Sequence, residues 1–346
     1  MRKYLLPESG NFYKANLHCH STVSDGNFTP EQIKEEYMKK GYSVVAYTDH
    51  NVMIDHSDLT DDKFLALRGF EIDVNEDYNF EAKKRARHKV CHICLIAKDP
   101  DNYTQICWDP NYPKGNAKNY VPQVVCDETK PAFPHVYSPE CINTIFKEAK
   151  ENGFFATYNH PNWSLETYEQ YSKYHGMAAM EIANYGCIEA GYDDYNAGAY
   201  DEILFGGERI YCVAADDNHN RPNQYKPDPL HDSFGCFNVI KAENLEYRTI
   251  TKALEDGNFY ASQGPEIYEL YFEDGMVHIK CSPVRTIQIR KGCRRHACID
   301  APKGETITEM SFPVDLEKDT YFRLTVIDRE GYPANTNAYF CDTLMD

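Results

Sequence analysis

LHCHSTVSDG, residues 17–26, is the most informative stretch of this 346-residue chain. Its two histidines, His18 and His20, are separated by one residue at the end of an apolar-leaning run, and residues i and i+2 of a β-strand point to the same face. The two imidazoles can therefore hold one metal ion, and Asp25 on the following turn can reach the same ion or a neighbouring one. Imidazole and carboxylate ligands together suit zinc, manganese or iron. Taken alone, the pattern also fits two histidines on an exposed strand.

Five further apolar strands carry residue types that bind metals. VVAYTDHN at 44–51 ends near His50, LRGFEID at 67–73 contains Glu71, HKVCHICLIA at 88–97 contains His92, FFATYNHP at 154–161 ends near His160, and IYCVAADDNH at 210–219 ends with Asp217 and His219. In four of the five, the residue stands at or just beyond the C-terminal end of the strand, where parallel α/β folds build their sites. Scattered core histidines would not fall there so regularly, so the pattern predicts one shared site.

The segments between these strands predict helices. Thr29, Pro30 and Gln32 have the pattern of an N-terminal cap and capping box, and helical spacing of apolar residues follows. The same features recur at 138–153, from Ser138 to a glycine, and 248–260 predicts a third helix that ends at Gly257. Alternating helices and strands indicate an α/β fold, with a parallel barrel favoured over a sandwich. After about residue 264, apolar and polar residues alternate and Asp-Gly, Lys-Gly and Glu-Gly turns intervene, which predicts a small antiparallel β domain.

In type and order, the metal-binding motifs over about residues 10–262 resemble those of the PHP (polymerase and histidinol phosphatase) family of metal-dependent phosphoesterases. The resemblance implies a distorted (β/α)7 TIM-like barrel over residues 1–262, with 98–137 as an insertion or lid. Residues 263–346 would form a β-sandwich-like domain, which resembles more loosely the C-terminal module of the CehA/McbA-type metallohydrolases.

The same resemblance implies a trinuclear metal centre of two to three divalent ions, zinc, manganese or iron. The first ion would be held by His18, His20, Glu71 and Asp217; Glu71 would bridge to a second ion on His92 and His160; a third would take Asp25, His50 and His219. Some family members have a histidine where this chain has Asp25, and the carboxylate should favour a harder ion. The implied reaction is hydrolysis of a small phosphate ester by a metal-bridging hydroxide.

Five further residues are predicted to assist this chemistry. Asp49 and Asp216 each adjoin a predicted ligand and are expected to orient imidazoles. His231 is a candidate donor of the proton that the leaving group needs, against the alternative of a plain loop histidine. Arg221 is a candidate phosphate clamp, against that of a solvent-exposed arginine. Arg68 is a weaker candidate of the same kind.

Residues 98–137 show no clear period and are rich in Pro, Asn, Asp and Tyr. So long an irregular segment is usually functional or disordered. We expect it to emerge at the active-site face and shape the substrate site, with Trp108, Tyr112, Lys114 and Tyr120 as contacts.

Composition narrows the class of protein. The net charge of −18 lacks the basic footprint of a protein that binds long nucleic acids. No apolar run approaches 18 residues, so no membrane span is expected, and the N-terminus lacks the h-region of a signal peptide. Thirteen scattered cysteines fit free thiols in a reducing cytoplasm. The expected partner is a small phosphorylated substrate, and the β domain is expected either to pack on the barrel or to support a homo-oligomer.

Three functions remain open from the sequence. The first is a phosphoesterase acting on a nucleotide, sugar or amino-alcohol phosphate. The second is a metallohydrolase of another bond, such as an ester, carbamate or amide, for which an apolar pocket without cations is expected. The third is a non-catalytic, metal-dependent binding protein.

Overall fold

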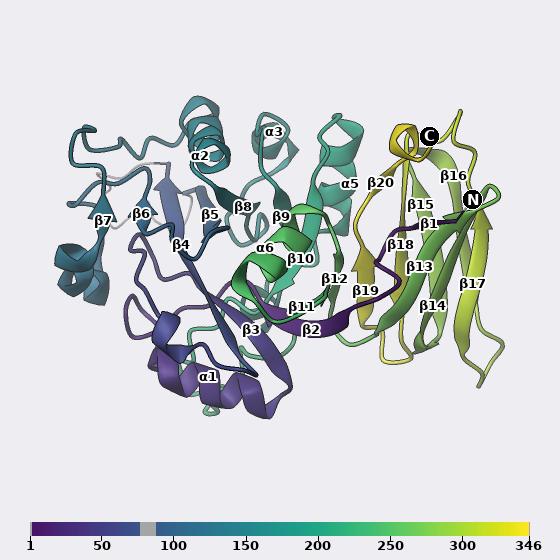
Figure 1. Ribbon diagram of the computed structural model, residues 1–346, viewed down its shortest axis with the longest axis horizontal. Helices are drawn as coiled ribbons and strands as arrows, with labels where there is room; N and C mark the ends of the chain where they lie inside the picture. The colour runs from purple at the N-terminus through teal and green to yellow at the C-terminus, as the bar shows by residue number, and fades with distance from the viewer. Residues whose placement is uncertain (1, 77–87, 346) are drawn as a thin grey trace.

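The computed structural model describes residues 2–76 and 88–345 and shows an α/β part continued by antiparallel strands (Figure 1). Eight strands form the α/β sheet, in the order β10 (Tyr211–Ala215), β9 (Ala179–Asn184), β8 (Phe154–Tyr158), β5 (Val90–Ala97), β4 (Leu65–Asn75), β3 (Tyr42–Tyr47), β2 (Asn11–Asn16) and β11 (Phe237–Ala242). The coarse prediction of an α/β fold with a C-terminal antiparallel region is confirmed.

This sheet curls around a shared core. One buried apolar cluster takes residues from all eight strands, namely Ala15, Val44, Leu65, Ile96, Phe155, Ala179, Val213 and Ile240. A flat sheet could not bring these residues into one cluster. Among the described residues no backbone ladder joins β10 to β11, but the Asn238 side chain bonds both the N–H and the carbonyl of Ala214 (3.1 and 2.8 Å). The two ends of the sheet therefore meet through a side chain.

The prediction of a parallel sheet is wrong for β5 and β11. The strands β2, β3 and β4 are parallel, as are β8, β9 and β10, but β5 runs antiparallel to both β4 and β8, and β11 runs antiparallel to β2. The reversal of β5 explains the place of His92. It stands near the start of β5, opposite Asp73, and so lies at the same edge as the C-terminal ends of the parallel strands.

The helices begin where their caps predict. In α1 (Pro30–Lys39) the Thr29 side chain accepts from Gln32 and the Gln32 side chain accepts from the Thr29 N–H, a complete capping box. Ser138 caps α2 (Pro139–Glu151), because its side chain accepts a hydrogen bond from the Cys141 N–H, and this helix lies within the predicted range 138–153. The remaining helices are α3 (Tyr168–Tyr171), α4 (Tyr185–Glu189), α5 (Ala197–Phe205) and α6 (Tyr247–Glu255).

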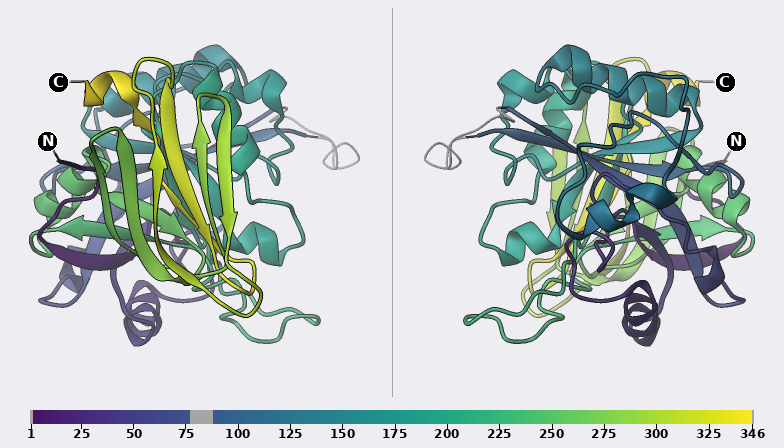
Figure 2. Two further views of the ribbon diagram at one scale, coloured as in Figure 1. Left: turned by 90° about the vertical axis from the view of Figure 1, so that its right-hand side faces the viewer. Right: turned by 90° about the vertical axis from the view of Figure 1, so that its left-hand side faces the viewer.

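The C-terminal strands continue the same sheet and pack a second one against it. Beyond β11 the order is β12 (Phe259–Ser262), β19 (Pro333–Thr336), β18 (Tyr321–Ile327), β15 (Thr286–Lys291) and β16 (Cys293–Asp300), with β20 (Tyr339–Phe340) beside β18. The second sheet has the order β1 (Lys3–Tyr4), β13 (Ile267–Glu273), β14 (Met276–Val284) and β17 (Ile307–Pro313). Figure 2 shows these strands with the N-terminus beside them. The sheet thus crosses position 262, and the domain boundary there stays a prediction.

Residues 98–137 contain two short strands, β6 (Thr104–Gln105) and β7 (Val125–Cys126), and a 3-10 helix at Gly115–Gln123. Trp108 and Tyr120 pack beside Val23, Val52 and Ala117. No helix in the described part of the chain is both long and apolar enough to cross a membrane.

Candidate metal centre

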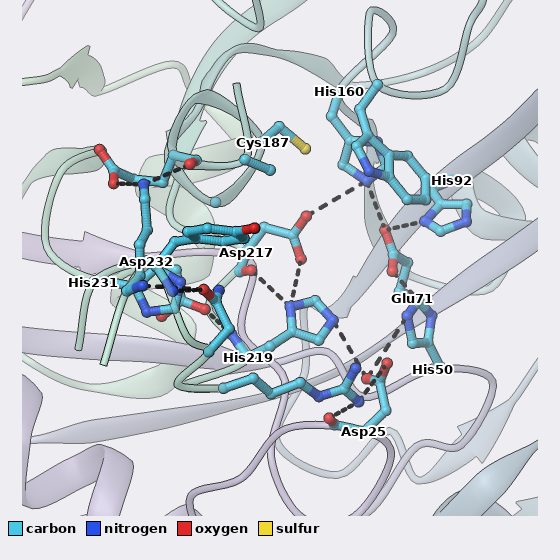
Figure 3. Close-up of a pocket in the computed structure, with 18 residues that line it drawn as sticks. Asp25, His50, Glu71, His92, His160, Cys187, Asp217, His219, His231 and Asp232 are labelled. Carbon is cyan, nitrogen blue, oxygen red and sulfur yellow. Dashed lines mark hydrogen bonds and ion pairs between the residues drawn. The ribbon is translucent and has the colours of Figure 1, made fainter. Parts of the chain in front are cut away.

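All nine predicted ligands converge at one edge of the curled sheet. Figure 3 shows seven of them, namely Asp25, His50, Glu71, His92, His160, Asp217 and His219. The nine side chains form four overlapping groups whose nitrogen and oxygen atoms lie within 4.8 Å of one another: His20, Asp25, His50 and His219; His18, Glu71 and His160; His18, His20 and Asp217; and His50, Glu71 and His92. The sequence therefore identified residues that the fold brings together, while their division among three ions stays a prediction.

The deepest part of the cluster surrounds His18. Its Nε2 lies 3.0 Å from His20 Nε2, 3.1 Å from Glu71 Oε1 and 3.2 Å from Asp217 Oδ1. These four side chains, from the loop after β2, from β4 and from the loop after β10, are almost fully buried. Ligand atoms about 3.4 Å apart are what a tetrahedral ion with bonds of about 2.1 Å requires.

Glu71 joins this part to its neighbours. Its Oε1 lies 3.2 Å from His92 Nδ1 and 3.5 Å from His160 Nε2, and its Oε2 lies 3.1 Å from His50 Nδ1. One carboxylate thus faces imidazoles from three other strands. This is the position that a bridging ligand would need.

Asp25 marks the outer part of the cluster. Its Oδ1 lies 3.4 Å from His219 Nε2, 3.8 Å from His20 Nδ1 and 3.9 Å from His50 Nε2. Asp25, His50 and His219 are half-buried, so this part faces the pocket.

Several cluster atoms are buried without a hydrogen-bond partner. Among the described residues these include Glu71 Oε2, Asp217 Oδ1 and His50 Nδ1. Buried polar atoms are rarely left unsatisfied, because each costs about 1–3 kcal/mol. Three unsatisfied atoms aimed into one imidazole and carboxylate cluster fit divalent cations, so the residues suit the ions that the sequence implies.

The electrostatics of the cluster agree with this fit. Burial would raise the pKa of Glu71, but the imidazoles of His18, His92 and His50 hold it well below its usual range. Burial lowers the pKa of His219, yet the hydrogen bond that it donates to Asp25 and the charge of Asp217 raise it to about 9. The Glu71 carboxylate is therefore kept ionised, as a ligand must be, whereas an ion bound by His219 would displace the proton that this imidazole otherwise holds.

The backbone is strained at two of the ligands. His160 and Asp217 have positive φ angles of 27° and 52°. Residues other than glycine rarely adopt this region, and such outliers concentrate at functional sites. The strain places both side chains over the end of the sheet.

A second layer of polar side chains, absent from the sequence predictions, orients the cluster. Glu181 on β9 is buried; its Oε1 lies 2.7 Å from His18 Nδ1, and its Oε2 accepts from the His160 N–H at 3.0 Å. Asn184 donates to Glu181 and to Asp217, and Asn159 donates to Glu71 at 2.9 Å. The signal for Glu181 was a single acid within the apolar run MAAMEIA at 177–183.

The predicted roles of Asp49 and Asp216 are wrong. Asp49 accepts hydrogen bonds from the backbone and hydroxyl groups of Ser21 and Ser24, so it shapes the loop after His20 instead of binding an imidazole. Asp216 accepts from three backbone N–H groups at 234–236 and from the Tyr37 hydroxyl. Burial raises the pKa of Asp216 to about 7 despite these bonds.

A pocket of about 630 Å³ opens over the cluster. Arg221 lines it, and its guanidinium lies 3.0 Å from Asp25 Oδ2. His231 also lines it, with Nδ1 2.8 Å from the Asp228 carbonyl oxygen. Arg68 does not: its side chain bonds the carbonyls of residues 100 and 102 and pairs with Asp55, away from the pocket.

None of the predicted contacts in 98–137 lines this pocket. Tyr112 stacks on His135 with ring centroids 3.6 Å apart, and Lys114 lies 3.3 Å from Asp73. The far wall comes from residues 186–190 and 221–232. The four side chains that were predicted to contact the substrate therefore lie outside this pocket. The role of residues 98–137 as a lid stays a prediction.

No family model and no curated protein matches the chain. Three solved structures are similar to it. A two-domain protein of Bacteroides vulgatus, described as containing a predicted PHP-like metal-dependent phosphoesterase, has 16% identity and a TM-score of 0.46 over 98% of this chain and 97% of its own. A second structure, of a Bifidobacterium adolescentis protein that is also described as an inferred metal-dependent phosphoesterase, has 14% identity and a TM-score of 0.37 over 64% of this chain and 91% of its own.

The third structure, an amidohydrolase of Chromobacterium violaceum with bound sulfate and no metal, has 16% identity and a TM-score of 0.35 over 59% of this chain and 87% of its own. The first description names the family that the sequence motifs resemble, while none names the C-terminal module. Because all three TM-scores lie below 0.5, the function proposed below rests on the geometry of the site.

Proposed function

We propose that this protein is a metal-dependent phosphoesterase that hydrolyses a small phosphate ester. The observation that carries the proposal is the convergence of six imidazoles and three carboxylates beneath a pocket that also presents a guanidinium. The proposal includes the finer fold, a distorted (β/α)7 barrel, a cytoplasmic location and a possible homo-oligomer.

The nine side chains of the cluster would hold two to three divalent ions, zinc, manganese or iron, with Glu71 shared between two of them. When bound, such ions act as Lewis acids on a phosphoryl group and lower the pKa of water toward neutrality. Glu181, Asn184 and Asn159 hold the ligands in place before any ion arrives.

Arg221 supplies a cation at the pocket rim. Its planar guanidinium can donate two parallel hydrogen bonds to phosphoryl oxygens. Its bond to Asp25 fixes the group beside the cluster before substrate binds. A second cation, Lys226, lines the pocket in an ion pair with Glu189. The guanidinium of Arg221 is therefore the group that favours a phosphate over the neutral ester, carbamate or amide that a cation-free pocket would suit.

In this proposal His231 moves a proton. Because the Asp228 carbonyl oxygen only accepts, His231 Nδ1 carries the hydrogen and Nε2 is left for the pocket. A protonated Nε2 would donate to the leaving oxygen of the ester.

The test joins metal content to turnover. Purified protein loaded with manganese or zinc is analysed by mass spectrometry and screened for phosphate release from nucleotide, sugar and amino-alcohol phosphates. We expect two to three ions and a turnover that His92→Ala lowers at least about 100-fold. His175→Ala is the matched control, because His175 is an exposed histidine paired with Glu208 outside the site. Full metal loading without phosphate release from any ester would contradict the proposal.

A further inference from the structure

We propose that Trp163 selects phosphate esters whose leaving group carries a flat aromatic ring, a choice that rests on the proposed function and narrows it. The indole lies against the metal cluster itself. Its ring centroid is 5.0 Å from that of His160 and 5.3 Å from that of His92. Both imidazoles lie within 3.5 Å of Glu71 Oε1, so Trp163 stands over the side of the cluster that those two histidines form.

The position of Trp163 is fixed before a ligand arrives. The N–H groups of Asn162 and Trp163 donate to the two carboxylate oxygens of Asp194, at 3.2 and 2.9 Å, and Asp194 is fully buried. The loop after β8 is therefore anchored at the residue that carries the indole. A preset aromatic surface binds a ring without the entropic cost of ordering the loop.

Trp163 nevertheless keeps 36% of its surface exposed, and it lines the pocket. A tryptophan that served only to shield the imidazoles would be expected to be buried. Its exposed surface faces the space above the cluster, which at about 630 Å³ is in the range of small-molecule sites and larger than a phosphate group requires. Atoms attached to the phosphoryl group would occupy this space.

The cation and the indole stand at different ends of the cluster. Figure 3 shows His160 and His92 together at one end and Asp25 at the other. Arg221 binds Asp25, whereas Trp163 contacts the two histidines. A phosphoryl group held near Arg221 and the cluster can therefore extend its leaving group toward the indole.

The pocket carboxylates do not favour a cationic leaving group. Glu189 pairs with Lys226, and Asp232 accepts from the N–H groups of His219 and Asn220. The other three, Asp25, Glu71 and Asp217, belong to the cluster. Each carboxylate among the residues that line the pocket thus either has a cation or backbone N–H partner or belongs to the proposed metal cluster, and none is left to pair with the ammonium group of an amino-alcohol phosphate. Trp163 and Tyr225 are the Trp and Tyr residues of the lining, and of these two it is Trp163 that contacts the imidazoles of the cluster.

A binding experiment tests this without turnover. The chain has two tryptophans, and Trp108 lies in a separate apolar cluster, so Trp108→Phe leaves Trp163 as the sole indole reporter. This variant, loaded with metal, is titrated with phenylphosphonate and with methylphosphonate, which cannot be hydrolysed. We expect phenylphosphonate to quench the fluorescence and to bind about 10-fold more tightly, which is about 1.4 kcal/mol. Calorimetry on Trp163→Leu should show this preference lost, and on Trp163→Phe largely retained.

Kinetics then separates the two proposals. Phenyl phosphate, a nucleoside monophosphate and glycerol phosphate are compared as substrates, the first two distinguishing an aryl from a nucleoside group. Trp163→Leu should lower kcat/KM for the aromatic esters about 10-fold relative to glycerol phosphate, mainly through KM. Equal binding of both phosphonates, or a uniform fall in kcat with loss of metal, would overturn the role of Trp163. Selective phosphonate binding with no hydrolysis of any ester would instead refute the phosphoesterase and leave the aromatic selectivity standing.

Discussion

Glu181 shows how a single residue prepares the cluster. Glu181 accepts a hydrogen bond from His18 Nδ1. The other ring nitrogen of His18, Nε2, faces Glu71 and Asp217 and is therefore left free to bind an ion. Its second oxygen holds the backbone at His160. One carboxylate therefore fixes the tautomer of one imidazole and the position of another.

Glu181→Gln should weaken metal binding about 10- to 100-fold, because the amide is a poorer acceptor and no longer makes the imidazole more basic. Competition between the protein and a chromophoric chelator measures the affinity. Glu208→Gln is the control: Glu208 lies 2.9 Å from His175 Nδ1 in an equivalent pair on the surface. Equal metal affinity in both variants would show that Glu181 has only a packing role.

For single residues, the sequence predicted well which side chains gather in the cluster, but it predicted poorly where the side chains of their neighbours point. The spacing of His18 and His20, and the strand ends at His50, His160 and Asp217, placed ligands at one edge because side-chain direction follows strand geometry. Asp49 and Asp216 were misjudged because neighbours in sequence point different ways. Whether such a residue meets an imidazole or a backbone turn depends on loops that periodicity does not describe.

Among the structural elements, the segments around β8 and α2 meet at a buried carboxyl group. Glu166 accepts hydrogen bonds from the hydroxyls of Tyr137, Tyr158 and Tyr174, at 2.7, 2.6 and 2.5 Å. Burial raises the pKa of Glu166 even though these three donors oppose the shift. The folded protein therefore binds a proton at Glu166 more tightly than the unfolded chain does.

Stability should consequently depend on pH through this group. The contribution of Glu166 is complete below the unfolded pKa of about 4.5 and is lost as pH rises through the higher folded value. Relative to the parent protein, Glu166→Gln should thus gain free energy of unfolding as pH rises above 4.5. Urea titrations of both proteins in chelator, from pH 4.5 to 8, measure this difference. Glu169→Gln, at an exposed position nearby, is the matched control, and a difference at Glu166 that does not vary with pH would contradict this role of Glu166.

The helices and strands themselves were largely predictable, since caps such as Thr29 and Ser138 act within one turn. The direction of β5 was not. Nothing in HKVCHICLIA distinguishes a parallel from an antiparallel strand. A strand that is buried on both faces is rich in apolar residues whichever way it runs. Direction is set by the connections and by the pairing with β4 and β8, which are long-range properties.

For the molecule as a whole, the C-terminal strands are tied to the α/β part by a buried ion pair. Arg323 on β18 is completely buried, and its Nε and Nη2 donate to the two carboxylate oxygens of Asp201 on α5, at 2.7 and 2.9 Å. Together with the pairing of β12 and β19, this contact makes the two parts share one core. We therefore expect them to unfold together.

Arg323→Ala should lower the free energy of unfolding by about 3–5 kcal/mol, because it leaves the Asp201 carboxylate buried without its main partner. Arg209→Ala is the control, since Arg209 pairs with Asp342 on the surface, where a loss of about 0–1 kcal/mol is expected. Urea unfolding followed by fluorescence and by circular dichroism gives both values. Two separate transitions in the parent protein would disprove the shared core.

The spread of the ligands along the chain has a consequence for biosynthesis. Roughly 200 residues separate His18 from His219, and a ribosome adds about 5–20 residues per second, so the first two histidines wait about 10–40 s for their last partner. Until then the nascent chain offers an incomplete ligand set with little power to discriminate between ions. The ion that the proposed function requires would therefore be selected after translation passes His219, from the ions that the cell makes available at that moment.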